Sequence, residues 1–130
     1  LLSDVGSEGA IDLVEGSKSA TADARRNFAE DSIVSIHTGD VAKILPRFSQ
    51  ANVIVLDPPR EGAGKEVIGE CARLLPRAIV YVACDPAALA RDVSYLREHG
   101  YTLQLLRAFD LFPMTHHIEC VALLTLDKVS

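Results

Sequence analysis

Cysteine, basic charge and long apolar runs are the scarce features of this 130-residue sequence. Its three cysteines form no Cys-x-x-Cys pair, and their odd number argues against a disulfide framework and for reduced thiols in a cytoplasm. No apolar run is long enough to span a bilayer and no signal-peptide pattern opens the chain, so we expect no membrane association. Thirteen basic against eighteen acidic residues give a net charge of −5, which argues against a domain that holds nucleic acid by electrostatics alone.

What the sequence does contain is a regular alternation of short β-branched segments and helix-forming segments. Strands are expected at 10–15, 32–37, 51–56, 78–83, 101–109 and 119–126, and helices at 17–30, 41–48, 65–75 and 86–100. This order predicts an α/β fold whose mostly parallel sheet has helices on both faces. The short connection between the last two strands predicts an antiparallel hairpin at the end of the sheet. The length predicts a single domain.

Cys84 lies where an apolar strand, expected to be buried on both faces, gives way to a helix. Asp85-Pro86 supplies an N-cap and a first-turn proline for that helix. Open α/β sheets bind ligands at this carboxyl edge, and the helix N-terminus favours a thiolate. The residues alone leave two interpretations, a nucleophile or a small buried side chain. The six residues between Cys84 and Arg91, with no glycine among them, argue against a phosphatase loop.

Acidic residues follow three other predicted strands. Asp57 opens the stiff loop Asp-Pro-Pro-Arg60, where it can accept from a ligand hydroxyl or amine or simply cap a turn. Glu15 ends the first strand, where adenosine-binding sheets place a carboxylate on the ribose hydroxyls; the alternative is a helix-dipole partner. Asp40, after Gly39, also fits an ordinary helix cap.

The segment His116-His117-Ile118-Glu119 precedes and opens the last strand. A metal site is disfavoured there because no further ligand cluster stands at suitable spacing, so the histidines are better placed to line a polar pocket. Glu119 opens an otherwise apolar strand. Its carboxylate is a general base if it is partly desolvated, or a solvated strand end if it is not.

Three segments taken together resemble the RNA uracil-C5-methyltransferases that use S-adenosylmethionine, in both their rRNA and tRNA branches. The segments are Leu-Asp57-Pro-Pro-Arg60-Glu-Gly62, Tyr-Val-Ala-Cys84-Asp-Pro86 with Leu89-Ala-Arg91-Asp92, and Asp110-Leu-Phe-Pro113-Met-Thr-His116-His-Ile-Glu119. Val14-Glu15-Gly-Ser with Ala24-Arg25-Arg-Asn27 is similar to the ribose-binding strand and helix of that family. The resemblance covers nearly the whole chain in the right order, and the combination is far more specific than any one segment.

The resemblance implies a Rossmann-like class I methyltransferase sheet, S-adenosylmethionine as cofactor and RNA as substrate. Cys84 is then the nucleophile that adds to C6 of uracil, and Glu119 is the base that removes the C5 proton. The other expected roles are cofactor binding for Glu15, Asp40 and Asp57, and RNA contact for Arg60, Arg91, His116 and His117. The uracil must be unstacked or flipped from its RNA. Ribosomal RNA is favoured over tRNA, and the resemblance does not specify the uridine.

Two departures from the family pattern matter. Asp85 stands where the family usually has Asn, which keeps the helix cap but loses an amide donor to the base. The family's glycine-rich first strand and upstream RNA-binding portions do not precede Leu1. We therefore expect residues 1–130 to be a truncated methyltransferase catalytic domain that lacks its first strand and is inactive alone. The sequence does not indicate an oligomeric state.

Two functions of other kinds compete with this interpretation. An amino-group methyltransferase acting on nucleic acid also has an acidic or amide residue before Pro-Pro, but it usually has an aromatic residue at the position of Arg60 and needs no cysteine. A cofactor- or RNA-binding module without activity fits the truncation, and it predicts that Cys84→Ala leaves function intact. A Rossmann-like domain with a merely structural thiol is disfavoured because three motifs coincide.

Overall fold

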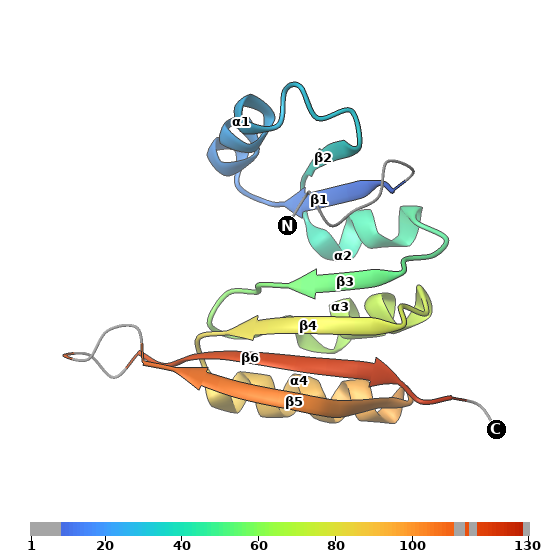
Figure 1. The fold of residues 1–130 in the computed structure, drawn as a ribbon, viewed down its shortest axis with the longest axis vertical. Helices are drawn as coiled ribbons and strands as arrows, with labels where there is room; N and C mark the ends of the chain where they lie inside the picture. Colours follow the sequence, from blue (N-terminus) through green and yellow to red (C-terminus); the bar gives the residue numbers. More distant parts are fainter. Residues whose placement is uncertain (1–8, 111–113, 115–116, 129–130) are drawn as a thin grey trace. The chain divides into compact units, whose positions relative to one another are not determined.

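The computed structural model describes residues 9–110, 114 and 117–128. Contacts divide the chain into two compact units, Leu1–Arg47 and Phe48–Ser130. The elements in chain order (Figure 1) are β1 (Ile11–Glu15), α1 (Lys18–Asn27), β2 (Val34–Thr38), α2 (Val41–Ile44), the 3₁₀ turn η2 (Leu45–Arg47), β3 (Val53–Leu56), α3 (Gly64–Arg73), β4 (Ala78–Ala83), α4 (Pro86–Glu98), β5 (Tyr101–Phe109) and β6 (Glu119–Leu126). No helix in these described ranges is long and apolar enough to cross a membrane.

The N-terminal unit is built on the parallel pair of strands β1 and β2, with α1 as the connection between them. Ser17 caps α1 by accepting a hydrogen bond from the Ala20 N–H, as its residue type predicts. The buried residue of α1 is Thr21, whereas Ala20 beside it is exposed. Thr21 is buried because its hydroxyl donates to the Lys18 carbonyl and accepts from Thr38 on β2.

The second predicted helix, 41–48, is shorter than expected. The α-helical part, α2, ends at Ile44, and η2 continues it as a single 3₁₀ turn. Pro46 explains the change, because proline has no N–H with which to continue the α-helical hydrogen bonds. Ile44 and Leu45 are buried.

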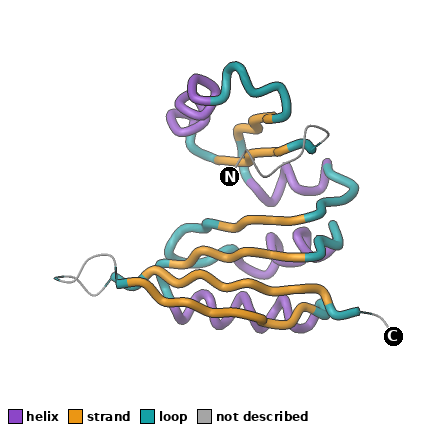
Figure 2. Tube along the Cα trace, viewed as in Figure 1, coloured by secondary structure: helices purple, strands orange, loops and turns teal. Residues whose placement is uncertain are grey.

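The C-terminal unit is a four-stranded sheet of order β3-β4-β6-β5, whose strands lie side by side in Figure 2. Strands β3 and β4 are parallel, and β6 runs antiparallel to both β4 and β5. The predicted C-terminal antiparallel hairpin is therefore confirmed. The sequence did not indicate that β6 would insert between β4 and β5, which leaves β5 at the edge of the sheet.

The core of this unit lies on one face of the sheet, against which α3 and α4 both pack (Figure 1). Buried residues alternate along β4 and β6 and meet the apolar faces of the helices; they are Ile79, Tyr81, Ala83, Cys120, Ala122 and Leu124 from the strands, and Ile68, Cys71, Leu89 and Leu96 from the helices. The expectation that β4 is buried on both faces fails within this unit. Among its described residues no helix covers the second face, where Val80 and Val82 are only half-buried.

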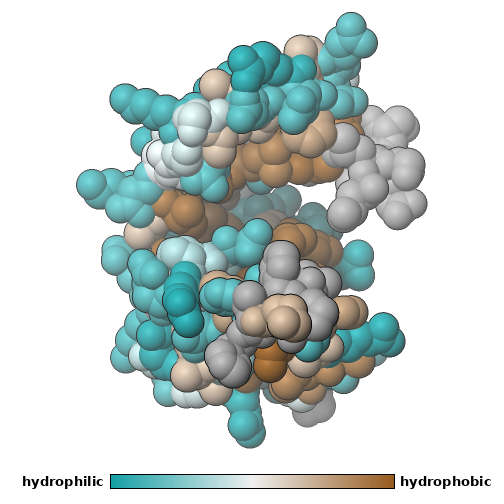
Figure 3. Space-filling model, turned by 90° about the vertical axis from the view of Figure 1, so that its left-hand side faces the viewer, coloured by the Kyte–Doolittle hydropathy of each residue, from teal (hydrophilic) through white to brown (hydrophobic). Residues whose placement is uncertain are grey.

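Large apolar side chains consequently remain at the surface of the C-terminal unit. Val55 on β3 is 61% exposed and Leu106 on the edge strand β5 is 54% exposed. Apolar residues, coloured brown, are accordingly visible at the molecular surface in Figure 3. The sheet thus has one face packed against helices and one exposed face. The predicted site residues Asp57, Cys84 and Glu119 lie at the carboxyl ends of β3 and β4 and at the start of β6.

Candidate active site

The carboxyl edge of the C-terminal sheet brings together most of the residues that the sequence singled out. Strand β3 ends at Leu56 and is followed directly by Asp57, whereas the parallel strand β4 ends at Ala83 and is followed by Cys84. Strand β6 runs the other way, so its first residue, Glu119, lies at the same edge. Parallel strands of an open α/β sheet present their ligand sites at this edge.

The β4–β6 register places Cys84 and Glu119 at the same end of two neighbouring strands. Ala83 pairs with Cys120 at the end of the β4–β6 ladder. Cys84 directly follows Ala83 and Glu119 directly precedes Cys120, so the two residues flank the last pair of this ladder. Neighbouring strands lie about 4.7–4.9 Å apart, so side chains at adjacent strand ends can reach a single small molecule.

Accessibility separates Cys84 from the other two cysteines. Cys71 and Cys120 are buried in the core, and burial raises the pKa of the Cys71 thiol to about 12. Cys84 is partly accessible. Only this thiol is therefore placed to meet a ligand from solvent.

Asp85 has the capping role that its place before Pro86 predicts. One carboxylate oxygen accepts hydrogen bonds from the N–H groups of Ala87 and Ala88, at 2.8 and 3.0 Å. The Ala88 hydrogen bond is the largest of several effects that lower the pKa of Asp85, and the charge of Arg60 adds to it. An Asn side chain would cap α4 equally well through its oxygen, so what Asp85 adds is a negative charge beside Cys84.

The loop after β3 is a tight turn held by its own backbone. The Gly62 N–H donates to the Pro59 carbonyl at 2.8 Å, and Gly62 has φ +86°, a conformation that favours glycine. Arg60, at the tip of the turn, is 73% exposed, and its Nε lies 4.0 Å from the free carboxylate oxygen of Asp85. Arg60 thus spans the loops that follow β3 and β4.

Arg91, whose side chain is 43% exposed, is hydrogen-bonded to neighbouring residues of the protein. Its guanidinium donates to the Glu61 carbonyl at 2.7 Å and to the carboxylate of Asp92 at 2.9 Å. The hydrogen bond and charge of Asp92 raise the pKa of Arg91. The predicted contact of Arg91 with RNA stays a prediction, because these bonds already account for much of its side chain.

The buried carboxylate of Asp92 is a feature to which the sequence analysis assigned no role. A signal was nevertheless present. Asp92 stands three residues after Leu89 and four before Leu96, on the buried stripe of α4, where an acidic side chain requires partners.

Glu15 and Asp40 lie together in the N-terminal unit. Glu15 ends β1 opposite Thr38, its carbonyl accepts from the Gly39 N–H at 3.0 Å, and Asp40 follows immediately. Each exposed carboxylate uses one oxygen locally, on the N–H of Ser17 and of Ala42 respectively. The second oxygen of each has no partner among the described residues, so both carboxylates can accept from a ligand.

The predicted histidine pair is only partly described. His117 is exposed just before β6, and His116 lies outside the described residues. In the part of the chain that the structure describes, no three His, Cys, Asp or Glu side chains come together as a possible metal site.

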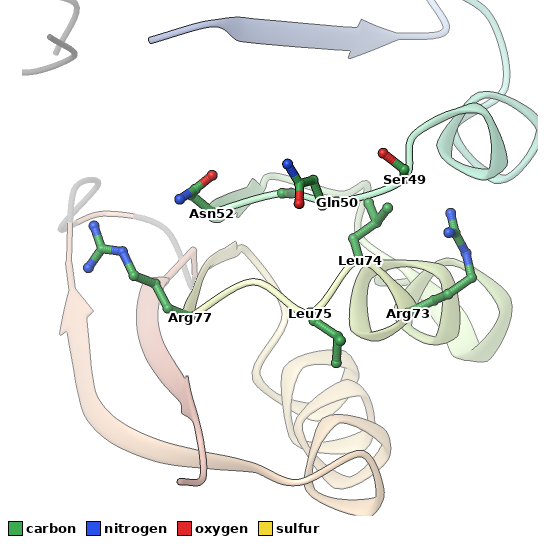
Figure 4. A pocket seen from close by; sticks show the side chains of 8 residues that line it. Ser49, Gln50, Asn52, Arg73, Leu74, Leu75 and Arg77 are labelled. Carbon is green, nitrogen blue, oxygen red and sulfur yellow. The ribbon is translucent and has the colours of Figure 1, made fainter. Parts of the chain in front are cut away.

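A hollow of about 360 Å³ lies at the opposite edge of this unit, where Asn52 precedes β3 and Arg77 precedes β4 (Figure 4). Arg73 and Arg77 stand at opposite ends of the lining residues in Figure 4, and Arg73 donates hydrogen bonds to Glu70 and to the Phe48 carbonyl. The hollow contains none of the predicted site residues, and the candidate active site remains at the carboxyl edge.

Comparison with known proteins identifies relatives of this chain. Residues 40–127 match the family described as tRNA (Uracil-5-)-methyltransferase. A protein named uncharacterized RNA methyltransferase, from Streptomyces avermitilis, is 53% identical over 122 residues, which cover 92% of this chain and 28% of the relative. The chain thus spans less than a third of that protein's length.

Solved structures agree with this assignment. The crystal structure of Pyrococcus abyssi tRNA (uracil-54, C5)-methyltransferase in complex with S-adenosyl-L-homocysteine is similar with a TM-score of 0.77 at 29% identity, over 89% of this chain and 29% of that one. Precorrin-6y C5,15-methyltransferase from Geobacter metallireducens shares the fold, with a TM-score of 0.73 at 18% identity over 92% of this chain and 68% of that one. The predicted Rossmann-like methyltransferase fold is confirmed, and the chain belongs to the tRNA (Uracil-5-)-methyltransferase family.

Proposed function

We propose that the protein transfers a methyl group from S-adenosylmethionine to C5 of a uridine in RNA, with Cys84 as nucleophile and Glu119 as base. The observation that supports this most is the β4–β6 register, whose last pair, Ala83 and Cys120, is flanked by the accessible Cys84 and by Glu119 at the sheet's carboxyl edge. Membership of the family and the likeness to the Pyrococcus abyssi enzyme support the reaction class.

The chain has carboxylates that fit the cofactor. Glu15 and Asp40 each offer a free oxygen that can accept a hydrogen bond from a ribose hydroxyl or the adenine amine, and Asp57 directly follows β3. When bound, S-adenosylmethionine supplies an electrophilic methyl group. The role of these three residues is to hold and orient it.

The residue types match the steps of the reaction. The Cys84 thiolate forms a bond from Sγ to C6 of uracil, and the electron pair of the C5–C6 double bond makes C5 nucleophilic. Once C5 has taken the methyl group, Glu119 removes the C5 proton. The released electron pair re-forms the double bond and expels Cys84 as a thiolate. Because C5 and C6 are adjacent atoms, the two side chains must act on one small region, as residues at the same end of neighbouring strands can.

Arg60 is the residue we propose as the first RNA contact of this edge, since its guanidinium is exposed beside the nucleophile's loop. His116 and His117 remain proposed contacts. The uracil must leave its stack to meet Cys84. Because the chain carries a net charge of −5, we propose that most phosphate contacts are made outside it.

We propose that both compact units belong to one catalytic domain, because the family match at 40–127 crosses the boundary between them. We also propose that residues 1–130 are inactive alone; they span 28% of the Streptomyces avermitilis relative. Ribosomal RNA stays the predicted substrate, and the alternative is tRNA, on which the Pyrococcus abyssi enzyme acts by its name.

The test uses the complete protein with S-adenosylmethionine and RNA that contains 5-fluorouracil. Fluorine at C5 prevents the final proton removal, so the enzyme is expected to remain covalently attached and to migrate slowly on a denaturing gel. Cys84→Ala should abolish the adduct, and the matched Cys120→Ala should retain it. Separate rRNA and tRNA transcripts identify the substrate. Methylation of RNA without any adduct contradicts the cysteine mechanism and favours amino-group methylation.

A further inference from the structure

The carboxylate of Asp92 is fully buried in the middle of α4 and takes no part in the proposed chemistry. One oxygen accepts from the Tyr81 hydroxyl at 2.5 Å, the Ala63 N–H at 2.7 Å and the Gly64 N–H at 3.3 Å. The other accepts from Nε and Nη2 of Arg91, at 3.1 and 2.9 Å. Five hydrogen bonds thus compensate the cost of burying this charge.

These bonds lead to one segment, the loop between β3 and α3. Arg91 also donates to the Glu61 carbonyl at 2.7 Å. Gly62 packs so closely that a Cβ placed on it would lie 2.7 Å from the Asp92 carboxylate and 2.6 Å from Nη2 of Arg91. All four residues from 61 to 64 therefore contact the Arg91–Asp92 pair.

The loop is fixed at both of its ends. At its start, Asp57 leaves β3 and the two prolines 58 and 59 restrict the backbone. At its end, the Arg91–Asp92 pair ties it to α4, the helix that begins directly after Cys84. Tyr81 adds a tie to β4, the strand that ends just before Cys84, because its hydroxyl also accepts from the Ala63 N–H at 3.2 Å. The segment carrying Asp57 and Arg60 is thereby joined to both elements that hold the nucleophile.

We infer that Asp92, acting through Arg91 and Tyr81, is a positioning residue that holds loop 57–64 so that Asp57 and Arg60 stay beside Cys84. The importance of these two residues to catalysis rests on the proposed function; the loop's attachment to Asp92 does not. The inference gives Arg91 an internal anchoring role in place of an RNA contact.

Loop order can be measured without any activity. Trypsin cleaves after Arg60 only when the loop leaves its turn. In the complete protein, Asp92→Asn should speed cleavage at Arg60 and deuterium exchange in a peptide spanning residues 61–64 by about tenfold or more, because the buried hydrogen bonds to a charged acceptor are weakened. Tyr81→Phe, which removes one donor and keeps the carboxylate, should have the same effect in smaller degree.

The matched control is Leu124→Ala, which weakens the same core at the other end of β6. It should lower overall stability without a selective increase at Arg60. Unchanged cleavage and exchange in Tyr81→Phe and in folded Asp92→Asn, or an equal increase in Leu124→Ala, would overturn the inference.

A kinetic cycle then tests the effect on the reaction. Asp92→Asn should raise the KM for RNA about tenfold in the wild-type background and leave it nearly unchanged in Arg60→Ala, because both changes remove the same positioned guanidinium. Additive effects would show that Asp92 acts only through stability. If the wild-type protein forms no adduct with RNA, the proposed function fails, while the cleavage result still decides whether Asp92 holds the loop.

Discussion

Replacing Gly62 by alanine should be among the most damaging single-methyl additions in the C-terminal unit. Gly62 has φ +86°, a backbone conformation that residues with a Cβ rarely adopt. The added Cβ would lie 2.6 Å from Arg91 Nη2, 2.7 Å from Asp92 Oδ2 and 3.2 Å from the Ala88 Cβ. Asp92 is fully buried, so it has no free space into which to retreat.

The expected loss of stability has two parts. The left-handed backbone conformation costs an L-residue about 1–2 kcal/mol. Displacing the Asp92 carboxylate breaks at least one hydrogen bond to a buried charged group, which costs about 1–3 kcal/mol. Together, Gly62→Ala should lower the free energy of unfolding by about 2–5 kcal/mol.

Two other glycines separate these parts. Gly64 has φ +82° but nothing within 4 Å of an added Cβ, so Gly64→Ala should cost only the backbone part, about 1–2 kcal/mol. Gly69 lies inside α3 in helical conformation with open space around it, and Gly69→Ala should stabilise the protein by about 0.5–1 kcal/mol.

The assay is a urea titration of the complete protein with pulse proteolysis, which compares the fraction folded among the variants at each urea concentration. The midpoints should rank Gly69→Ala, wild type, Gly64→Ala and Gly62→Ala, from highest to lowest. A Gly62→Ala midpoint equal to or above that of Gly64→Ala would refute the close packing of Gly62 against the Asp92 carboxylate.

Three further outcomes follow from the described residues. Iodoacetamide should alkylate Cys84 in the native protein and leave the buried Cys71 and Cys120 unmodified. Mass spectrometry of the digested protein identifies the modified cysteines. Labelling of all three in the folded protein would contradict the burial of Cys71 and Cys120. The pKa of Asp85 is lowered in the folded state, so its carboxylate adds stability above about pH 4, and this stability is lost as the pH falls through the folded pKa. Asp85→Asn should therefore lose less stability than the wild type on acidification below about pH 4. A melting temperature that falls as much with decreasing pH in this variant as in the wild type would contradict this prediction. Leu75 is 67% exposed with φ +52° after α3, so Leu75→Gly should stabilise the protein by about 1 kcal/mol, and a lower melting temperature would contradict it.

Local chemistry made many of the elements predictable. Strands β5 and β6 have the bounds that their apolar and β-branched residues indicate. The turn from β4 into α4 could be identified because Asp85 and Pro86 form a helix start with a known mechanism. Pro46 could likewise have indicated that the α-helical part of α2 ends early, although the apolar residues around it suggested a longer helix.

Long-range pairings could not be deduced in the same way. Cys84 and Glu119 are 35 residues apart, and only the insertion of β6 beside β4 brings them to the same end of neighbouring strands. The residue pattern of β6 does not show whether this strand pairs with β4 or lies at the edge of the sheet. The Asp92 network was hidden for a similar reason, because its partners come from β4, from α4 itself and from the loop before α3.

The pairing of Cys84 with Glu119 is the central claim, and one measurement tests both residues on ordinary RNA. In the complete protein with Glu119→Gln, Cys84 should still add to uracil and C5 of uracil should still accept the methyl group. The variant should then fail to remove the C5 proton. We therefore predict that this variant accumulates a covalent protein–RNA adduct with unsubstituted RNA, and that adding Cys84→Ala abolishes it. Wild-type turnover by Glu119→Gln, or an adduct that persists after Cys84→Ala, would contradict the account.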